Sequence, residues 1–387
     1  MRKIFGGRFA WPIFLLLLLL ALPVWATNAP SFGDDSSTVI LRGRVLAVED
    51  VEVTAEMEGI VKAEQLAEIE IISGDFRGEK HTLLNGLMGN PFFDIELEEG
   101  SLVILYGEVD DSGRLRNIYL ADRMRDTYLY ILAALFVFLI LVIGRRKGLV
   151  TIVTLLITII AVFRILLPML LKGYVPIPST VLVASGVTFI TLLGIGGWQR
   201  KTLAAVIGTV SGVLVAGLLA LIVGNAANLT GFSSEEAQML TFMEGVNLDV
   251  RGLLFAGIII GALGAVMDVA MSIAAASYEV YAVNPSISVR EQIKSGLNVG
   301  RDVMGTMANT LILAYVGASI PLLLLFLGYN TPYITIINLD MVATEVVRAL
   351  AGSIGIISAV PLTAVSAGLL RKFDRIPQME VSEEAKR

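Results

Sequence analysis

The chain has 387 residues, of which 55% are hydrophobic and 17% are charged. This composition is too apolar for an ordinary soluble domain and predicts a multi-span membrane protein. The net charge of −6 does not alter this prediction, because the positions of the charges matter more than their sum. The lack of cysteine and the single histidine, His81, exclude disulfides, thiolate metal sites and histidine clusters, so we expect no metal and no cofactor.

The first 26 residues are typical of a secretory signal peptide. Arg2, Lys3 and Arg8 form a basic start, an apolar run follows, and residues 24–26 (VWA) resemble a cleavage site with small residues. An uncleaved N-terminal anchor is the alternative. In both cases, we expect the segment that follows to be exported.

Residues 27–126 are polar and predict a separate β-rich domain outside the cytoplasm. TVILRGRVLAV, EIEIISGDF, DIELEEGSLVILYGEV and RLRNIYLAD are rich in β-branched residues with partial alternation, and residues 110–113 (DDSG) predict a hairpin turn. Four to six short strands favour a small barrel, OB-like, or a sandwich. Without a basic patch interleaved with aromatic residues, we expect no nucleic acid partner.

Residues 127–372 predict a polytopic helical bundle in the lipid bilayer, so the fold class is mostly α with an N-terminal all-β domain. Seven apolar runs are long enough to span: 127–144, 149–171, 179–197, 202–223, 252–273, 304–327 and 346–370. Lys and Arg concentrate in alternate loops, which places the tail, residues 373–387, in the cytoplasm and the β-rich domain outside. We expect the protein in the bacterial cell membrane.

Small residues recur along three of these runs. The spacing of such residues predicts close helix packing, with the fifth run at the centre of a compact bundle. They are Ala204, Gly208, Gly212 and Ala216 in the fourth run, Gly257, Gly261, Gly264 and Ala265 in the fifth, and Gly352 and Gly355 in the seventh. The inner loop of about residues 274–303 predicts a surface helix, capped by Ser286 or Ser288.

One carboxylate, Asp268, lies inside the fifth run, about 16 residues (~24 Å) from its outer end, and therefore in the inner third of the membrane. Asp302, Thr306 and Asn309 share one face of the sixth run at comparable depth. We expect Asp268 to face this stripe and to be satisfied by Arg301, Thr306 or Asn309. Such a network is either an ion or proton site or a structural polar core.

A second polar pair, Glu345 and Arg348, lies at the outer start of the seventh run. Their spacing of three residues predicts an ion pair on one helix face. Pro168 is expected to kink the second run, in which Arg164 lies within reach of the outer surface.

The sequence argues against an enzyme. The residues that flank Asp268 and Asp302 do not match the Tyr-Asp and Gly-x-Gly-Asp pairs of intramembrane aspartyl proteases. The only histidine lies in the outer domain, so no Ser-His pair is available, and nucleotide-binding glycine motifs are absent.

Three blocks between Gly261 and Pro361 resemble the bacterial YibE/F-like family: GALGAVMDVAMSIAAA, SGLNVGRDVMGTMANTLILAYVGASIPLLL and ATEVVRALAGSIGIISAVPLTA. The resemblance implies a multi-pass membrane protein with an exported β-rich domain, and it implies no substrate or reaction. The matching blocks contain Asp268, Ser272, Arg301, Asp302, Thr306, Asn309, Glu345 and Arg348.

Two functions compete. The first is a transporter or permease in which Asp268, Ser272, Thr306, Asn309, Asp302 and Arg301 bind a small ion or carry a proton. Against it, we see no inverted repeat and no broken helix pair. The second is a scaffold or envelope sensor that recognises an envelope or membrane protein through its β-rich domain.

Overall fold

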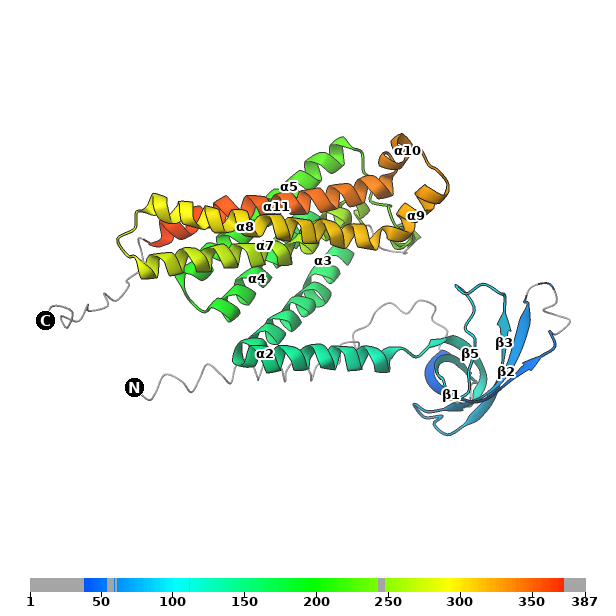
Figure 1. Ribbon diagram of the computed structural model, residues 1–387. Coiled ribbons are helices and arrows are strands. Elements are labelled where there is room, and N and C mark those ends of the chain that lie inside the picture. The colour runs from blue at the N-terminus through cyan, green and yellow to red at the C-terminus, as the bar shows by residue number, and fades with distance from the viewer. Residues whose placement is uncertain (1–37, 54–58, 60, 111, 243–247, 372–387) are drawn as a thin grey trace, which may run out of the picture. The chain divides into compact units, whose positions relative to one another are not determined.

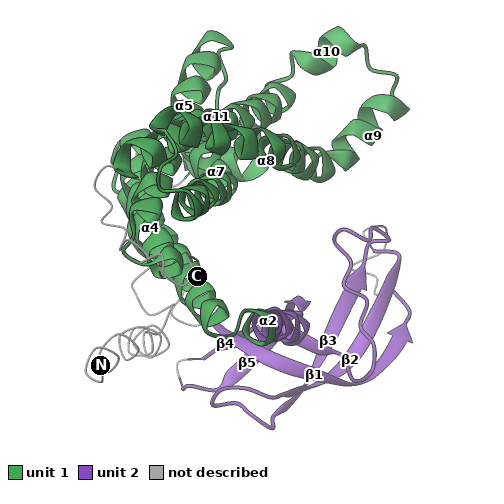
Figure 2. Ribbon diagram, turned by 60° about the vertical axis from the view of Figure 1, so that its left-hand side comes forward, with its two compact units in different colours: residues 1–12, 140–387 green, residues 13–139 purple. Residues whose placement is uncertain are grey.

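A computed structural model describes residues 38–53, 59, 61–110, 112–242 and 248–371 (Figure 1). The predicted signal segment and cytoplasmic tail lie outside these residues. The chain divides into two compact units, residues 13–139 and residues 1–12 with 140–387 (Figure 2). The division falls within the first predicted span, in which the side chains of residues 129–139 are exposed.

The β unit is one antiparallel sheet in the order β3-β2-β1-β4-β5. Its strands are β1 (Thr38–Val51), β2 (Ala63–Ile71), β3 (Lys80–Leu87), β4 (Leu102–Val109) and β5 (Leu115–Arg123). The edge strands β3 and β5 approach each other, so the sheet curls into a half-barrel. Alternate side chains such as Val45, Ile69 and Leu105 fill its inner face and are fully buried. This architecture agrees with the expected small, barrel-like domain.

The predicted hairpin turn joins β4 to β5. The Asp110 carboxylate accepts hydrogen bonds from the backbone N–H groups of Ser112 and Arg114, both at 2.9 Å. Gly113 has a φ of 77°, which a glycine adopts without strain. The sequence did not indicate β3, and residues 94–97, which it included in a strand, are irregular.

The rest of the chain is helical. The helices are α2 (Asp126–Ala161), the π-helix η1 (Val162–Leu166), α3 (Leu167–Leu171), α4 (Pro176–Gly196), α5 (Arg200–Ala226), α6 (Glu235–Met239), the 3-10 helix η2 (Leu240–Phe242), α7 (Val250–Val283), α8 (Val289–Ala318), α9 (Ile320–Gly328), α10 (Tyr333–Ile337) and α11 (Asp340–Leu370). The π-helical turn directly precedes α3, which carries Pro168 in its first turn. Because proline lacks the N–H that the preceding turn needs, it accounts for this irregularity.

Five of these helical runs are long and apolar enough to cross a membrane, or six if α8 and α9 form one bent span. The first run, Asp126–Leu171, has 46 residues and would extend ~69 Å if straight, against a hydrocarbon core of ~30 Å. It is interrupted at Arg145, whose backbone is not helical (φ 49°, ψ −124°). This break separates the first two predicted spans, and the total of seven stays a prediction.

The helical unit packs around α7, which contacts the four long helices α4, α5, α8 and α11 (Figure 1). This confirms the predicted central position of the fifth run. The small residues of α5 and α11 also meet as expected. An atom added as Cβ at Gly212 would lie 2.8 Å from the carbonyl oxygen of Gly355, and one added at Gly355 would lie 2.8 Å from the Cβ of Ala216.

Two helices differ from the prediction. α7 continues to Val283 and α8 begins at Val289, so most of the expected inner loop is helical and there is no separate surface helix. Ser288, one of the two predicted caps, caps α8 in a capping box with Glu291. Nothing in the sequence indicated a broken helix, yet α8 and α9 meet at Ser319 with a bend of 59°.

Candidate functional site

Asp268 lies near the middle of α7. It follows Val250 by 18 residues and precedes Val283 by 15, which correspond to ~27 Å and ~22 Å of helix. The sequence placed it nearer the inner end because the predicted span stopped ten residues too early. In an α7 that crosses a bilayer, this carboxylate lies deep within the hydrocarbon.

The side chain of Asp268 points away from the centre of the bundle. Val266, Val269, Ala270 and Ile273 pack inward and are fully buried, whereas Asp268 is exposed. We call the exposed stripe of α7 the Asp268 face; it consists of Gly257, Gly261, Gly264, Asp268 and Ser272. A Cβ added at Gly257 or Gly264 would meet no atom within 4 Å. The expectation of packing against a neighbouring helix is therefore wrong for Gly257 and Gly264 in this chain alone, whereas Gly261 meets Tyr315 of α8.

Two of the three predicted partners of Asp268 bond elsewhere. Arg301 donates a hydrogen bond to Asn298 at 3.1 Å, and the Thr306 hydroxyl donates one to the carbonyl of Val303 at 2.9 Å. Within the described part of the chain, Asp268 has no hydrogen-bond or ion-pair partner. The local pairing proposed from the sequence is thus not formed.

The polar stripe of α8 does share one helix face, as the spacing predicted. Asp302, Thr306 and Asn309 are all exposed, because α8 packs on the core through Val303 and Met307 on its other side. The network expected between Asp268 and this stripe is therefore not enclosed between the helices. Both polar stripes lie on the outer surface of the helical unit.

The predicted ion pair between Glu345 and Arg348 is confirmed. Their side chains meet at 2.7 Å on the first turns of α11 and are 32% and 28% exposed. The Arg348 Nε is buried and has no hydrogen-bond partner among the described residues. This guanidinium therefore retains an unused donor inside the helical unit.

Tyr315, which the sequence reasoning missed, lies between the Asp268 face and the pair of Glu345 and Arg348. A Cβ added at Gly261 would lie 2.8 Å from the Tyr315 hydroxyl, so this tyrosine lies against the Asp268 face. Tyr315 and Glu345 also line one cavity of about 250 Å³, beside Ser319 at the break between α8 and α9. A polar residue in the otherwise apolar stretch LILAYVGA was the only sequence signal for it.

No group of three His, Asp or Glu side chains suited to a metal ion occurs in the residues that the structure covers. The Asp268 face instead offers a single carboxylate, a serine hydroxyl and open backbone at Gly257 and Gly264. Tyr315 of α8 and the pair of Glu345 and Arg348 of α11 lie nearer the break between α8 and α9, and we call these three residues with Asp268 and Ser272 the polar row. Such a row can hold water, a proton or a small cation.

Comparison with known proteins identifies one family. A family model described as YibE/F-like protein matches residues 132–373, which comprise most of the helical unit. No curated protein and no solved structure matches the chain.

Proposed function

Because the chain belongs to the YibE/F-like family and its apolar helices are compatible with a membrane protein, we propose that it transports a small cation or protons across the bacterial cell membrane. Asp268 would bind the ion or carry the proton. Ser272 and Tyr315 would supply neutral oxygens on either side of it, and Asp302, Thr306, Asn309 and Arg301 would line the adjoining face of α8.

The observation that supports this proposal most is the carboxylate without an internal partner. A charged aspartate at the centre of a spanning helix costs about 2.5–3.5 kcal/mol on insertion scales. In a membrane, α7 would carry this cost unless Asp268 is protonated, binds a cation or contacts water. A residue that alternates between these states is what an ion or proton carrier requires.

The bend between α8 and α9 supports the same proposal. Broken spanning helices are a common way for transporters to expose backbone groups near a bound ion. Here the break at Ser319 shares its cavity with Tyr315 and Glu345, and Tyr315 reaches Gly261 on the Asp268 face. A change in the bend would therefore alter the surroundings of the polar row.

Flux measurements in liposomes test the proposal. The full chain, its Asp268→Asn variant and a matched Glu279→Gln variant, which removes an exposed carboxylate from the same helix, are reconstituted and assayed with pH- and cation-sensitive dyes. We expect flux in the parent and in Glu279→Gln, and its loss in Asp268→Asn at an unchanged thermal midpoint. Unaltered flux in a folded Asp268→Asn variant would contradict the proposal that Asp268 carries the ion or proton.

A specific feature of the β unit favours the second candidate, an envelope sensor or assembly partner. Phe92 and Phe93 are 84% and 64% exposed and meet edge to face at 4.8 Å. They border a cavity of about 780 Å³ that is also lined by Arg123 and Arg125. Exposed aromatic residues beside charged groups are typical of protein contact surfaces.

Site-specific photo-crosslinking in intact cells tests this alternative. A crosslinker at position 92 is compared with one at Glu99, an exposed residue of the same unit. A discrete crosslinked product from position 92 alone would support an envelope partner. The same pattern from both positions, or no product at all, would count against it.

A further inference from the structure

A second polar cluster lies at the end of the helical unit where α4 leads into α5 and α7 leads into α8. The start of α5, the end of α7, the start of α8 and the residue after α11 meet there. They line one small cavity through Arg200, Lys201, Tyr278, Tyr281, Gln292 and Arg371. The positive-inside rule assigns this end to the cytoplasm.

Contacts between the helices hold this cluster in place. Arg371 donates hydrogen bonds to the carbonyl of Ile287 at 2.6 Å and to Gln292 at 3.3 Å, and it stacks 5.0 Å from the ring centre of Tyr281. The Lys201 ammonium lies 5.1 Å from the ring centre of Tyr278. Since these partners come from α5, α7, α8 and the end of α11, the cationic groups are positioned by the fold.

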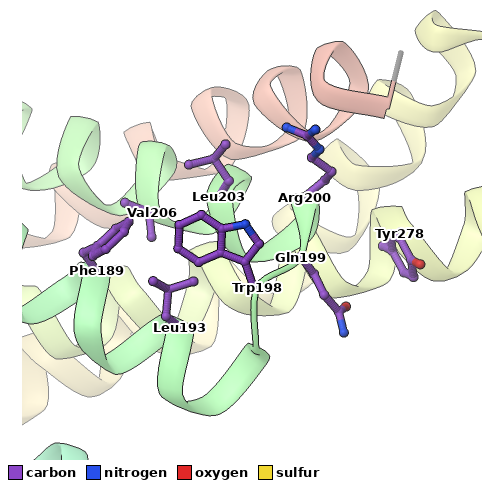
Figure 3. A pocket seen from close by; sticks show the side chains of 8 residues that line it. All are labelled: Phe189, Leu193, Trp198, Gln199, Arg200, Leu203, Val206 and Tyr278. Atoms are coloured by element: carbon purple, nitrogen blue, oxygen red, sulfur yellow. The ribbon is translucent and has the colours of Figure 1, made fainter. Parts of the chain in front are cut away.

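A larger cavity of about 430 Å³ adjoins the cluster and shares Arg200 and Tyr278 with it (Figure 3). Its lining is divided in two. Phe189, Leu193, Leu203 and Val206 form an apolar part, whereas Gln199, Arg200 and Tyr278 form a polar part, with Trp198 between them in Figure 3. The Trp198 ring is 79% exposed and meets Phe189 edge to face at 6.2 Å.

All charged residues that line the two cavities are basic: Arg200, Lys201 and Arg371. The helix α5 also begins at Arg200, and no side chain caps its first turn. The positive end of its helix dipole adds to the positive potential at the same place. The polar part of the cavity is therefore suited to an anion, and the apolar part to a hydrocarbon chain.

We propose that this cavity binds one anionic phospholipid, with the phosphate at Arg200, next to Lys201 of the adjoining small cavity, and an acyl chain against the apolar part of the lining. Phosphate is the anion that basic pockets between spanning helices commonly hold. The apolar wall and the exposed Trp198 favour a lipid over a soluble phosphate compound, because tryptophan concentrates at the membrane interface. The site is separate from Asp268 and does not depend on transport.

Tryptophan fluorescence provides a direct test. Trp198 becomes the only tryptophan once Trp11 and Trp25, outside the described residues, are replaced by phenylalanine. This parent is reconstituted in phosphatidylcholine vesicles that contain 10 mol% of brominated phosphatidylglycerol or brominated phosphatidylcholine. Bromine quenches an indole only at close range, so the ratio of the two quenching curves reports the headgroup preference at Trp198.

We expect the parent to prefer phosphatidylglycerol roughly tenfold or more, since two basic residues lie where its anionic headgroup would bind. In Arg200→Gln/Lys201→Gln the ratio should fall toward one. In the matched Arg290→Gln/Lys294→Gln variant, which removes two basic residues of the same end that line neither cavity, it should persist. Lys201→Arg, which keeps the charge, should also retain it.

Three outcomes would overturn the proposal. Equal quenching by both lipids in the parent would mean that there is no headgroup preference. An equal loss in both double variants would indicate attraction by the whole basic surface. Reversal of the phosphatidylglycerol quenching by millimolar glycerol phosphate or inorganic phosphate would show that the site takes a soluble phosphate compound rather than a lipid.

Discussion

Close helix packing at Gly212, where the nearest atoms belong to three other residues on α7 and α11, provides a sharp test of the structure. A Cβ added there would lie 2.8 Å from the Gly355 carbonyl oxygen, 2.8 Å from the Val266 Cγ1 and 2.9 Å from the Ala359 Cβ. The first of these atoms is backbone and the last is fixed to it, so neither can rotate away. Gly212→Ala must therefore move α5 relative to α7 and α11.

The expected cost follows from two opposing effects. Overpacking a dense core costs about 1–3 kcal/mol, while alanine gains about 1 kcal/mol over glycine in a helix. Gly264→Ala on α7 is the matched control, because its new Cβ would meet nothing within 4 Å and only the helix-propensity gain remains. The difference between the two variants therefore isolates the packing cost, and we expect about 1–3 kcal/mol.

Reversible unfolding in mixed detergent micelles, followed by circular dichroism, measures this difference for the full chain. Gly212→Ala should shift the midpoint to lower denaturant and Gly264→Ala should leave it unchanged or raise it. Equal midpoints for the two variants would refute the close approach of α5 and α11. They would also remove the basis for treating Gly264 as open.

Three further predictions concern local interactions. Ser288→Ala removes the side-chain cap of α8 and should cost about 1 kcal/mol in the same unfolding assay, whereas Ser288→Thr should cost less; equal effects would contradict the cap. A double-mutant cycle of Glu345→Gln and Arg348→Gln should give a coupling of about 1 kcal/mol for the ion pair at 2.7 Å, and additive effects would argue against the pair. The hydrogen bond from Arg125, at 2.7 Å, lowers the pKa of Asp122 in the β unit. This carboxylate therefore stabilises the fold above its unfolded pKa, and the stabilisation is lost as the pH falls through the lowered pKa. The difference in thermal midpoint between the parent and Asp122→Asn should be present at neutral pH and shrink below about pH 4, and a pH-independent difference would contradict this.

The sequence alone determined the features that depend on near neighbours in the chain. The apolar runs coincide with helices, the DDSG segment with a turn, Ser288 with a cap, and Glu345 with Arg348 in an ion pair. Each results from hydrogen bonds or side-chain contacts within a few residues. Sequence spacing specifies such contacts directly.

Only the tertiary structure decided which side of each helix packs. In a membrane protein the lipid-facing and core-facing sides are both apolar, so the periodicity that identifies the buried face of a soluble helix is weak. The spacing of Gly257, Gly261 and Gly264 therefore suggested a packed side, and the fold places it outside with Asp268. Sequence spacing also could not predict the contacts of Tyr315 or the cluster of Arg200, Tyr278 and Arg371. Helices that are far apart in the chain bring these residues together.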